Sequence, residues 1–255
     1  MLTGKSGIIF GVANHHSLAW HIAKTLSAAG ARLALTYQDQ RFEHKLVKMA
    51  ENELQDQPLF LLCDVKDDAQ IETLYQRLSN DFGKLDFIVH SIAFAAKEDL
   101  EGFFVNTSRT GFLTAMEASV YSLLAVVRPA LPLLAEGGSV ITLSYLGSKR
   151  VIPNYNVMGV AKAALESSVR YLAADLGGSG IRVNALSPGP VNTLSARGIK
   201  GFSGFLGQVR EKTPLKRNIE GEEVGKAALF LCSDLSSGIT GETIYIDAGY
   251  QILGL

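Results

Sequence analysis

The sequence is poor in features of secreted, membrane-spanning and nucleic-acid-binding proteins. Its 255 residues contain two cysteines, Cys63 and Cys232, which are too few for a disulfide framework and lie in apolar surroundings. No signal-peptide pattern precedes the first strand, and no apolar run approaches the roughly 18 residues that cross a bilayer. Because 24 Lys+Arg oppose 25 Asp+Glu, the net charge of −1 offers no basic surface to phosphate backbones. We expect a cytoplasmic protein that binds no nucleic acid and has no membrane span.

Motifs of metal and hydrolytic enzymes are missing as well. The five histidines have no partners at metal-ligand spacing, so no metal site is predicted. Neither a P-loop nor a G-x-S-x-G elbow is present. These absences argue against a zinc enzyme or a serine hydrolase.

What is present is a regular alternation of strands and helices. A hydrophobic share of 47% with 19% charged residues excludes a disordered chain. Strands are predicted at 6–12, 32–37, 59–63, 85–91, 139–144, 182–187 and 243–246, and helices at 18–29, 41–52, 69–82, 114–134, 155–176 and 224–232. This alternation predicts an α/β fold over residues 1–255. We expect a single Rossmann-like, doubly wound domain with a central, mostly parallel seven-stranded sheet flanked by helices.

One segment departs from this alternation. Between Pro188 and Pro214 several glycines are interspersed with Phe202, Phe205 and Leu206. A long, glycine-punctuated connection inside a compact domain is typical of a lid, and its apolar residues favour closure over an apolar substrate. We predict a mobile substrate lid at about 191–207, with an ordinary frayed loop as the alternative.

The ends of the first two predicted strands indicate a dinucleotide site. Gly11 follows the first strand and Ser17-Leu18 begins the first helix, where backbone N–H groups attract phosphate. A single glycine there is also typical of an ordinary turn. Gln38 ends the second strand, where a ribose binds, and no Arg or Lys follows before Arg41 to hold a 2′-phosphate. The pattern favours NADH over NADPH.

Tyr155 and Lys162 form the strongest candidate catalytic pair. They are seven residues apart on one predicted helix, so both side chains lie on the same face, two turns apart. Such a lysine can bind ribose hydroxyls and lower the pKa of a nearby phenol, which can donate to a developing oxyanion. Tyr145 precedes the helix as a second phenol. The alternative is that Tyr155 packs in the core and Lys162 is solvated.

Further short motifs are distributed along the chain from about Leu2 to its C-terminus. They are Gly11-Val-Ala-Asn, Ser17-Leu-Ala, Cys63-Asp-Val, His90-Ser-Ile-Ala-Phe-Ala, Leu143-Ser-Tyr-Leu-Gly, the block from Pro153 to Lys162, Gly189-Pro-Val-Asn-Thr-Leu, Ser233-Asp-Leu and Ile239-Thr-Gly. Together the motifs resemble the short-chain dehydrogenase/reductase superfamily and, within it, the bacterial enoyl-[acyl-carrier-protein] reductases of type II fatty acid synthesis. The most specific part is the block 143–162.

The position of the tyrosine separates this family from its relatives. Most short-chain dehydrogenases place it four residues before the lysine, where this chain has Met158. A phenol at Tyr155 lies about 4.5 Å further along the helix axis. An enoyl reductase delivers hydride to Cβ, so the oxygen that becomes negative is the more distant one of the thioester. The longer spacing suits reduction of a trans-2-enoyl thioester.

The resemblance also assigns roles to single positions. It implies that Tyr145, Tyr155 and Lys162 are catalytic and that Ala95, Tyr145 and Tyr155 border the substrate. It implies an NADH site formed by Gly11, Ser17, Leu18, Gln38, Asp64, Val65, Ile92, Lys162, Val191, Asn192, Thr193, Leu194 and Ser195. It further implies a homotetramer whose substrate is linked to acyl carrier protein, with Arg197 and Lys200 remaining as basic residues to dock that acidic carrier.

Two other functions stay open at this point, and one residue differs from the usual family pattern. The chain could be a carbonyl or 3-oxoacyl reductase of the same superfamily, against which Met158 argues, or a non-catalytic NAD(H) sensor, against which the Tyr155–Lys162 pair argues. The family usually has glycine where this chain has His21. We therefore expect the first helix to pack differently or to direct that ring to solvent.

Overall fold

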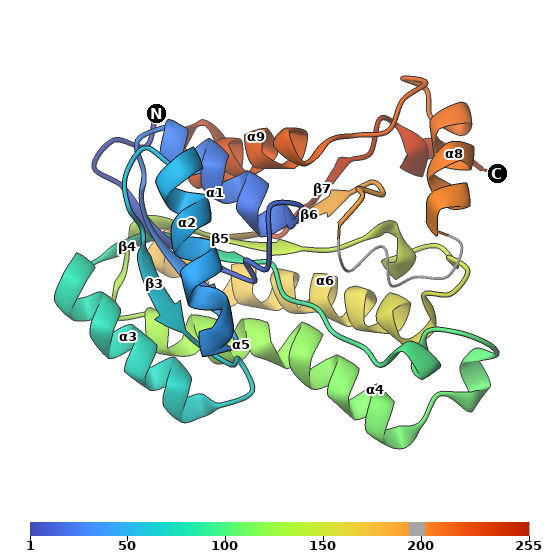
Figure 1. Cartoon of the computed structure of the whole chain (residues 1–255), viewed down its shortest axis with the longest axis horizontal. Helices are drawn as coiled ribbons and strands as arrows, with labels where there is room; N and C mark the ends of the chain where they lie inside the picture. Colours follow the sequence, from blue (N-terminus) through green and yellow to red (C-terminus); the bar gives the residue numbers. More distant parts are fainter. Residues whose placement is uncertain (194–201, 255) are drawn as a thin grey trace.

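The computed structural model describes residues 1–193 and 202–254, and a parallel sheet forms its centre. The strand order is β3-β2-β1-β4-β5-β6-β7, and every pair of neighbours runs parallel (Figure 1). The strands are β1 Ser6–Phe10, β2 Arg32–Tyr37, β3 Leu59–Leu62, β4 Leu85–His90, β5 Leu134–Leu143, β6 Arg182–Pro188 and β7 Thr243–Ile246. The strand order reverses between β1 and β4, where doubly wound folds bind their ligands. The predicted fold class is confirmed.

Helices cover both faces of the sheet. They are α1 Leu18–Ala28, α2 Glu43–Glu53, α3 Asp68–Phe82, α4 Arg109–Met116, α5 Ser122–Val127, α6 Asn156–Leu176, α8 Phe202–Lys212 and α9 Gly221–Cys232. Figure 1 shows α1, α2 and α9 on one face and α3, α5 and α6 on the other. This arrangement follows from the βαβ connections, since each right-handed crossover places its helix on a face.

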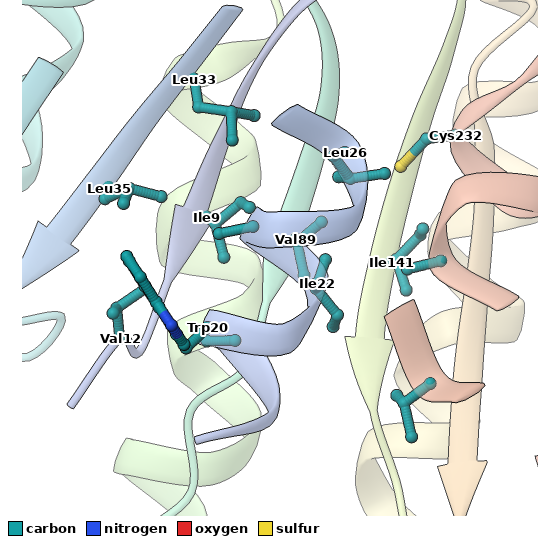
Figure 2. Close-up of a cluster of buried hydrophobic side chains, with 14 of the residues drawn as sticks. Ile9, Val12, Trp20, Ile22, Leu26, Leu33, Leu35, Val89, Ile141 and Cys232 are labelled. Carbon is teal, nitrogen blue, oxygen red and sulfur yellow. The ribbon is translucent and has the colours of Figure 1, made fainter. Parts of the chain in front are cut away.

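The core consists of two hydrophobic clusters, one on each face of the sheet. In the first cluster, Trp20, Ile22 and Leu26 of α1 pack with Ile9 and with residues of other strands (Figure 2). The helical spacing of these apolar residues turns one face of α1 to the sheet. Cys232 belongs to the same cluster, and both cysteines are buried and unpaired, as their apolar surroundings predicted.

The bounds predicted for the helix at 114–134 are wrong at both ends. It begins at Arg109, because the hydroxyl of Ser108 caps it by accepting from the Gly111 N–H at 2.9 Å. It continues through a π-helical segment into α5 and ends in a 3₁₀ turn at Arg128–Ala130, while Leu134 already pairs with Leu85 in the sheet. By length and composition alone the stretch Arg109–Ala130 could cross a membrane, but its most apolar window is 56% buried in the fold, as in a core helix.

The segment predicted as a lid contains a helix that the glycine pattern did not indicate. Its last residues, 202–207, belong to the helix α8, which continues to Lys212, although Gly204 and Gly207 lie within this helix. Phe205 explains part of its placement, since its ring meets that of Tyr250 edge to face with centroids 6.4 Å apart. Residues 194–201 of the predicted lid lie outside the described residues.

Candidate active site

The turn after β1 is built for close approach of two backbones. Gly11 has a φ of +93°, and a β carbon there would come within 2.1 Å of the Ser91 carbonyl oxygen at the end of β4. No other residue type fits both the dihedral angle and the space. The structure therefore requires glycine at position 11, which lies at the switch point of the sheet.

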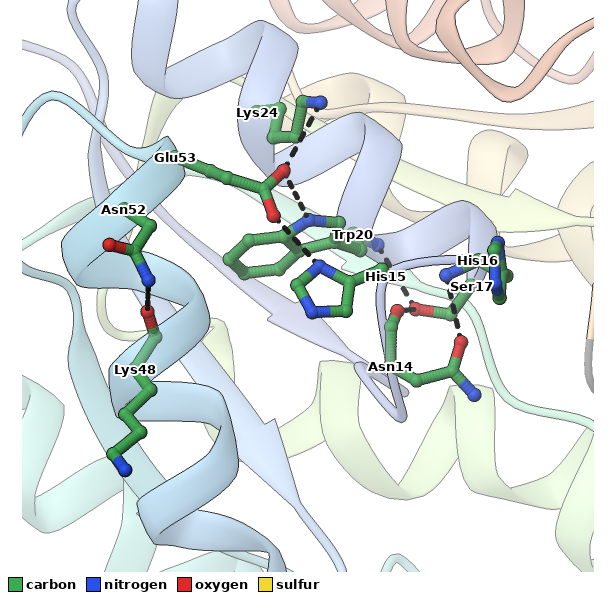
Figure 3. A network of polar contacts seen from close by, with 9 residues as sticks. All are labelled: Asn14, His15, His16, Ser17, Trp20, Lys24, Lys48, Asn52 and Glu53. Atoms are coloured by element: carbon green, nitrogen blue, oxygen red, sulfur yellow. Dashed lines mark hydrogen bonds and ion pairs between the residues drawn. The ribbon is translucent and has the colours of Figure 1, made fainter.

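Ser17 begins α1 and fixes the end of this turn. Its hydroxyl donates to the Asn14 carbonyl oxygen at 2.7 Å and accepts from the Trp20 N–H at 3.3 Å (Figure 3). The Asn14 side chain in turn accepts from the His16 N–H at 2.8 Å. Because α1 starts here, its first N–H groups and the positive end of its dipole point into the turn. Gly11, Ser17 and the half-buried Leu18 thus form a site that suits a pyrophosphate.

A carboxylate from α2 ties this turn to the rest of the fold. Glu53 binds three groups: the His15 ring at 2.7 Å, the Trp20 indole N–H at 3.2 Å and the Lys24 ammonium at 3.2 Å (Figure 3). The sequence analysis did not find Glu53, because 38 residues separate it from His15 and no local pattern links them.

The residues expected at the adenosine end come together at the ends of β2 and β3. The Gln38 amide donates to the Asp64 carboxylate at 3.2 Å. Val65 is buried and Ile92 is half-buried, and both pack into the second hydrophobic cluster. Beside Gln38, the Arg41 guanidinium holds the Asp39 carboxylate at 2.5 Å and lowers the pKa of Asp39 to about 2. The nearest cation in sequence is therefore already engaged by an acid.

Lys162 lies in the interior, so the alternative of a solvated lysine is wrong. It is 4% exposed, and its ammonium donates to the Leu143 carbonyl oxygen at the end of β5 at 2.6 Å. Burial lowers its pKa to about 8. A lysine held in this way loses its proton more easily than a surface lysine does.

Tyr155 and Tyr145 form an aromatic pair above the end of β5. Their ring centroids lie 5.0 Å apart at an interplanar angle of 68°. A β carbon on Gly147 would come within 2.6 Å of the Tyr155 ring, so glycine is required for this packing. Burial raises the pKa of both phenols, and it raises that of Tyr155 more than that of Tyr145. The sequence analysis had expected a neighbouring lysine to lower the pKa of the phenol. Both phenols therefore stay protonated and can donate hydrogen bonds.

Met158 occupies the position where most of the superfamily has its tyrosine. It is buried, and its sulfur lies 3.8 Å from the Ser119 hydroxyl. The same hydroxyl accepts from the Phe94 N–H at 3.0 Å and so fixes the segment after β4 that leads to the half-buried Ala95. This position thus packs in the core and offers no acid.

The segment after β6 is described only in part. Val191 packs against the first hydrophobic cluster, and the Thr193 N–H donates to the Val191 carbonyl oxygen at 2.7 Å, with Asn192 exposed between them. Leu194 and Ser195, and with them Arg197 and Lys200, lie outside the described residues.

His21 packs against another helix, which decides between the two possibilities for this position. A β carbon on Gly221 of α9 would come within 2.2 Å of the His21 ring, and one on Gly225 within 2.9 Å of the His21 carbonyl oxygen. Gly221 thus makes room for the ring that α1 carries instead of glycine, and Gly225 lets the two helices approach closely. Burial lowers the pKa of His21, whose Nδ1 has no hydrogen-bond partner among the described residues.

The geometry first defines a class of protein. A glycine turn at the switch point of a doubly wound parallel sheet, with a tyrosine at the N-cap and a buried lysine on the helix after β5, is the arrangement of a dinucleotide-dependent oxidoreductase of the short-chain dehydrogenase/reductase type. The family model described as "Enoyl-(Acyl carrier protein) reductase" matches residues 11–251. The chain belongs to the enoyl-(acyl carrier protein) reductase family.

Individual relatives agree with this family over the whole chain. The chain is 49% identical to the Bacillus cereus enoyl-[acyl-carrier-protein] reductase [NADH] FabI, covering 100% of this chain and 99% of that protein. It is 47% identical to a Staphylococcus aureus enoyl-[acyl-carrier-protein] reductase [NADPH] FabI, covering 99% of this chain and 98% of that protein.

Solved structures give the same result. A crystal structure of the Bacillus cereus enoyl-acyl carrier protein reductase with NADP⁺ and indole naphthyridinone superposes with a TM-score of 0.97 at 49% identity, covering 100% of this chain and 99% of that one. The enzyme from Aquifex aeolicus, named as using NADH, gives a TM-score of 0.95 at 47% identity, with coverages of 100% and 99%.

Proposed function

We propose that this chain reduces the trans-2 double bond of enoyl-[acyl-carrier-protein] thioesters with NADH, in the last step of each elongation cycle of type II fatty acid synthesis. The observation that carries the proposal is the replacement of the usual tyrosine by a buried Met158, with the phenol of Tyr155 set three residues earlier beside Tyr145. The chemistry that bound NADH would supply here is hydride transfer to Cβ of the enoyl group. The alternative reductases of the superfamily need an acid at the Met158 position.

In this proposal the chain's own residues bind, orient and donate. Gly11, Ser17 and Leu18 hold the pyrophosphate on the N-terminus of α1, while Gln38 and Asp64 contact the adenosine. Lys162 donates to the nicotinamide ribose. Val65 and Ile92 shape the adenine and ribose walls, with residues 191–195 bracketing the nicotinamide.

Tyr155 is the proposed donor to the thioester oxygen. Since burial keeps its phenol protonated, it can hydrogen-bond the negative charge that collects on that oxygen as hydride arrives at Cβ. Tyr145 and Ala95 border the acyl chain, and the apolar residues of a lid at about 191–207 exclude water from it.

The preference for NADH rests on the end of β2. A 2′-phosphate next to Gln38 would be repelled by the Asp39 carboxylate. The nearest cation in sequence, Arg41, is already paired with that carboxylate. The acidic carrier protein, the homotetramer and the cytoplasmic location also belong to the proposal. The carrier protein is supported by relatives named as enoyl-[acyl-carrier-protein] reductases, whereas the homotetramer and the location rest on the family resemblance.

The test is a turnover assay with purified protein. NADH absorbance is followed with crotonyl and longer enoyl thioesters, first on coenzyme A and then on acyl carrier protein, and with 3-oxoacyl thioesters in parallel. We expect consumption of NADH with the enoyl substrates and none with the 3-oxoacyl substrates. Binding of NADH without turnover of either carrier-linked substrate would replace this function with that of a nucleotide sensor.

A further inference from the structure

Glu166 is a buried carboxylate in the middle of α6 to which no sequence motif assigned a role. It is 4% exposed, and one of its oxygens, Oε1, accepts from the Ser144 hydroxyl at 2.6 Å and from the Ser148 hydroxyl at 2.7 Å. A carboxylate is costly to bury unless hydrogen bonds replace its water. Its two serine donors belong to the connection between β5 and α6, where Tyr145 lies.

These two serines enclose the segment that shapes the aromatic pair. Ser144 directly precedes Tyr145 and Ser148 directly follows Gly147. Tyr145 meets the Tyr155 ring edge to face, and Gly147 lies against that same ring. A carboxylate that holds Ser144 and Ser148 together thus fixes two of the surfaces that position the Tyr155 phenol.

Glu166 also lies one helical turn from Lys162, on the same face of α6. Lys162 donates to the Leu143 carbonyl oxygen at 2.6 Å, so consecutive turns of α6 hold consecutive residues at the end of β5. The Glu166 carboxylate favours the charged form of Lys162 through space. Two other titratable groups interact with this pair electrostatically: His90 of β4 with Lys162, and Lys149 of the connection with Glu166.

We propose that Glu166 is a positioning residue of the reductase site, which clamps the segment 144–148 under the Tyr155 ring and supplies a negative charge one helical turn from the Lys162 ammonium. The inference rests on the proposed roles of Tyr155 and Lys162. It assigns two separable tasks to one carboxylate: its oxygen accepts from the serines, and its charge acts on the lysine.

The charge is tested with Glu166→Gln. The amide oxygen of this variant can still accept from both serines, while the negative charge is lost. The matched control is Asp175→Asn, which removes an exposed carboxylate from the same helix. NADH binding to each protein is measured by fluorescence from pH 6 to pH 10. This range includes the pKa of Lys162 in the wild type, which is about 8.

Binding that depends on protonated Lys162 weakens as the pH rises through that pKa. Without the carboxylate the pKa of Lys162 falls further, so we expect the midpoint of this loss to move down by about one pH unit in Glu166→Gln and to stay in place in Asp175→Asn. An unmoved midpoint in a folded Glu166→Gln protein would overturn the electrostatic task. Because binding is the readout, this holds whether or not enoyl thioesters are reduced.

The clamp is tested with the double variant Ser144→Ala/Ser148→Ala, which keeps the carboxylate and removes both of its donors. We expect kcat with an enoyl thioester to fall about tenfold while the Kd for NADH at pH 7 stays unchanged, because the Tyr155 ring loses its support. Wild-type kcat in the double variant would overturn the clamp. An inactive wild type would refute the proposed function instead, and melting temperatures of all variants report any general loss of folding.

Discussion

The Tyr145 and Tyr155 rings lie edge to face, with centroids 5.0 Å apart, on two segments joined by Gly147 and its neighbours. Edge-to-face pairs of this kind are attractive through the rings themselves, independently of the hydroxyl groups. Either hydroxyl can therefore be removed while the ring packing stays. This property makes the pair suitable for assigning the oxyanion donor by substitution.

Replacing Tyr155 by phenylalanine should lower kcat by about 10²–10³ and leave NADH affinity unchanged, because one donor to the thioester oxygen is lost. The comparison is Tyr145→Phe, for which we expect a smaller effect. Steady-state kinetics with an enoyl thioester and NADH fluorescence titrations measure both quantities. If Tyr145→Phe were the slower variant, the donor would have to be reassigned to Tyr145.

Gly147→Ala should displace the Tyr155 ring, since the added β carbon would come within 2.6 Å of ring carbon Cδ1. We expect at least a tenfold loss of kcat from this misplacement. Gly177→Ala serves as control, because Gly177 at the end of α6 has a helical φ of −58° and open space around it. That control should keep full activity. Equal activities of the two variants would show that the ring position does not limit the reaction.

Asp39→Asn should weaken the preference for NADH over NADPH. The substitution removes an acid beside the ribose site and releases the Arg41 guanidinium for a 2′-phosphate. We expect kcat/KM for NADPH to rise about three- to tenfold, with that for NADH little changed. Adding Arg41→Ala to this variant should abolish the gain. A gain that survives the second substitution would exclude Arg41 as the ligand.

Gly221→Ala should destabilise the protein through a clash with the His21 ring, whose Cδ2 lies 2.2 Å from the added β carbon. Overpacking of this kind costs about 1–3 kcal/mol of unfolding free energy. His21→Ala removes the ring, so the double variant should recover most of that loss. Urea unfolding of the four proteins gives the coupling energy. Purely additive effects would contradict a direct contact between the His21 ring and position 221.

Much of this protein could be predicted from local patterns. The alternation of apolar strands and amphipathic helices predicted the sheet, since short apolar runs indicate buried strands and a period of 3.6 residues indicates helices. The boundary at Arg109 was missed because a capping interaction of Ser108 overrode the apolar pattern that started later. Helix α8 was missed because its glycines indicated a loop, whereas contacts such as that of Phe205 with Tyr250 are formed between distant segments.

The candidate site also has features that local patterns indicate and features that they do not. The residue types and their spacing can be read from the sequence: Tyr155 stands seven residues before Lys162, Met158 lies between them, and Gly11 follows the first strand. The three-dimensional fold was needed to see that Lys162 is buried against the Leu143 carbonyl and that Glu53 and Glu166 each bind residues far from them in the chain. The physical reason is that burial, and with it the pKa and the hydrogen-bond partners of a group, depends on which segments the fold brings together.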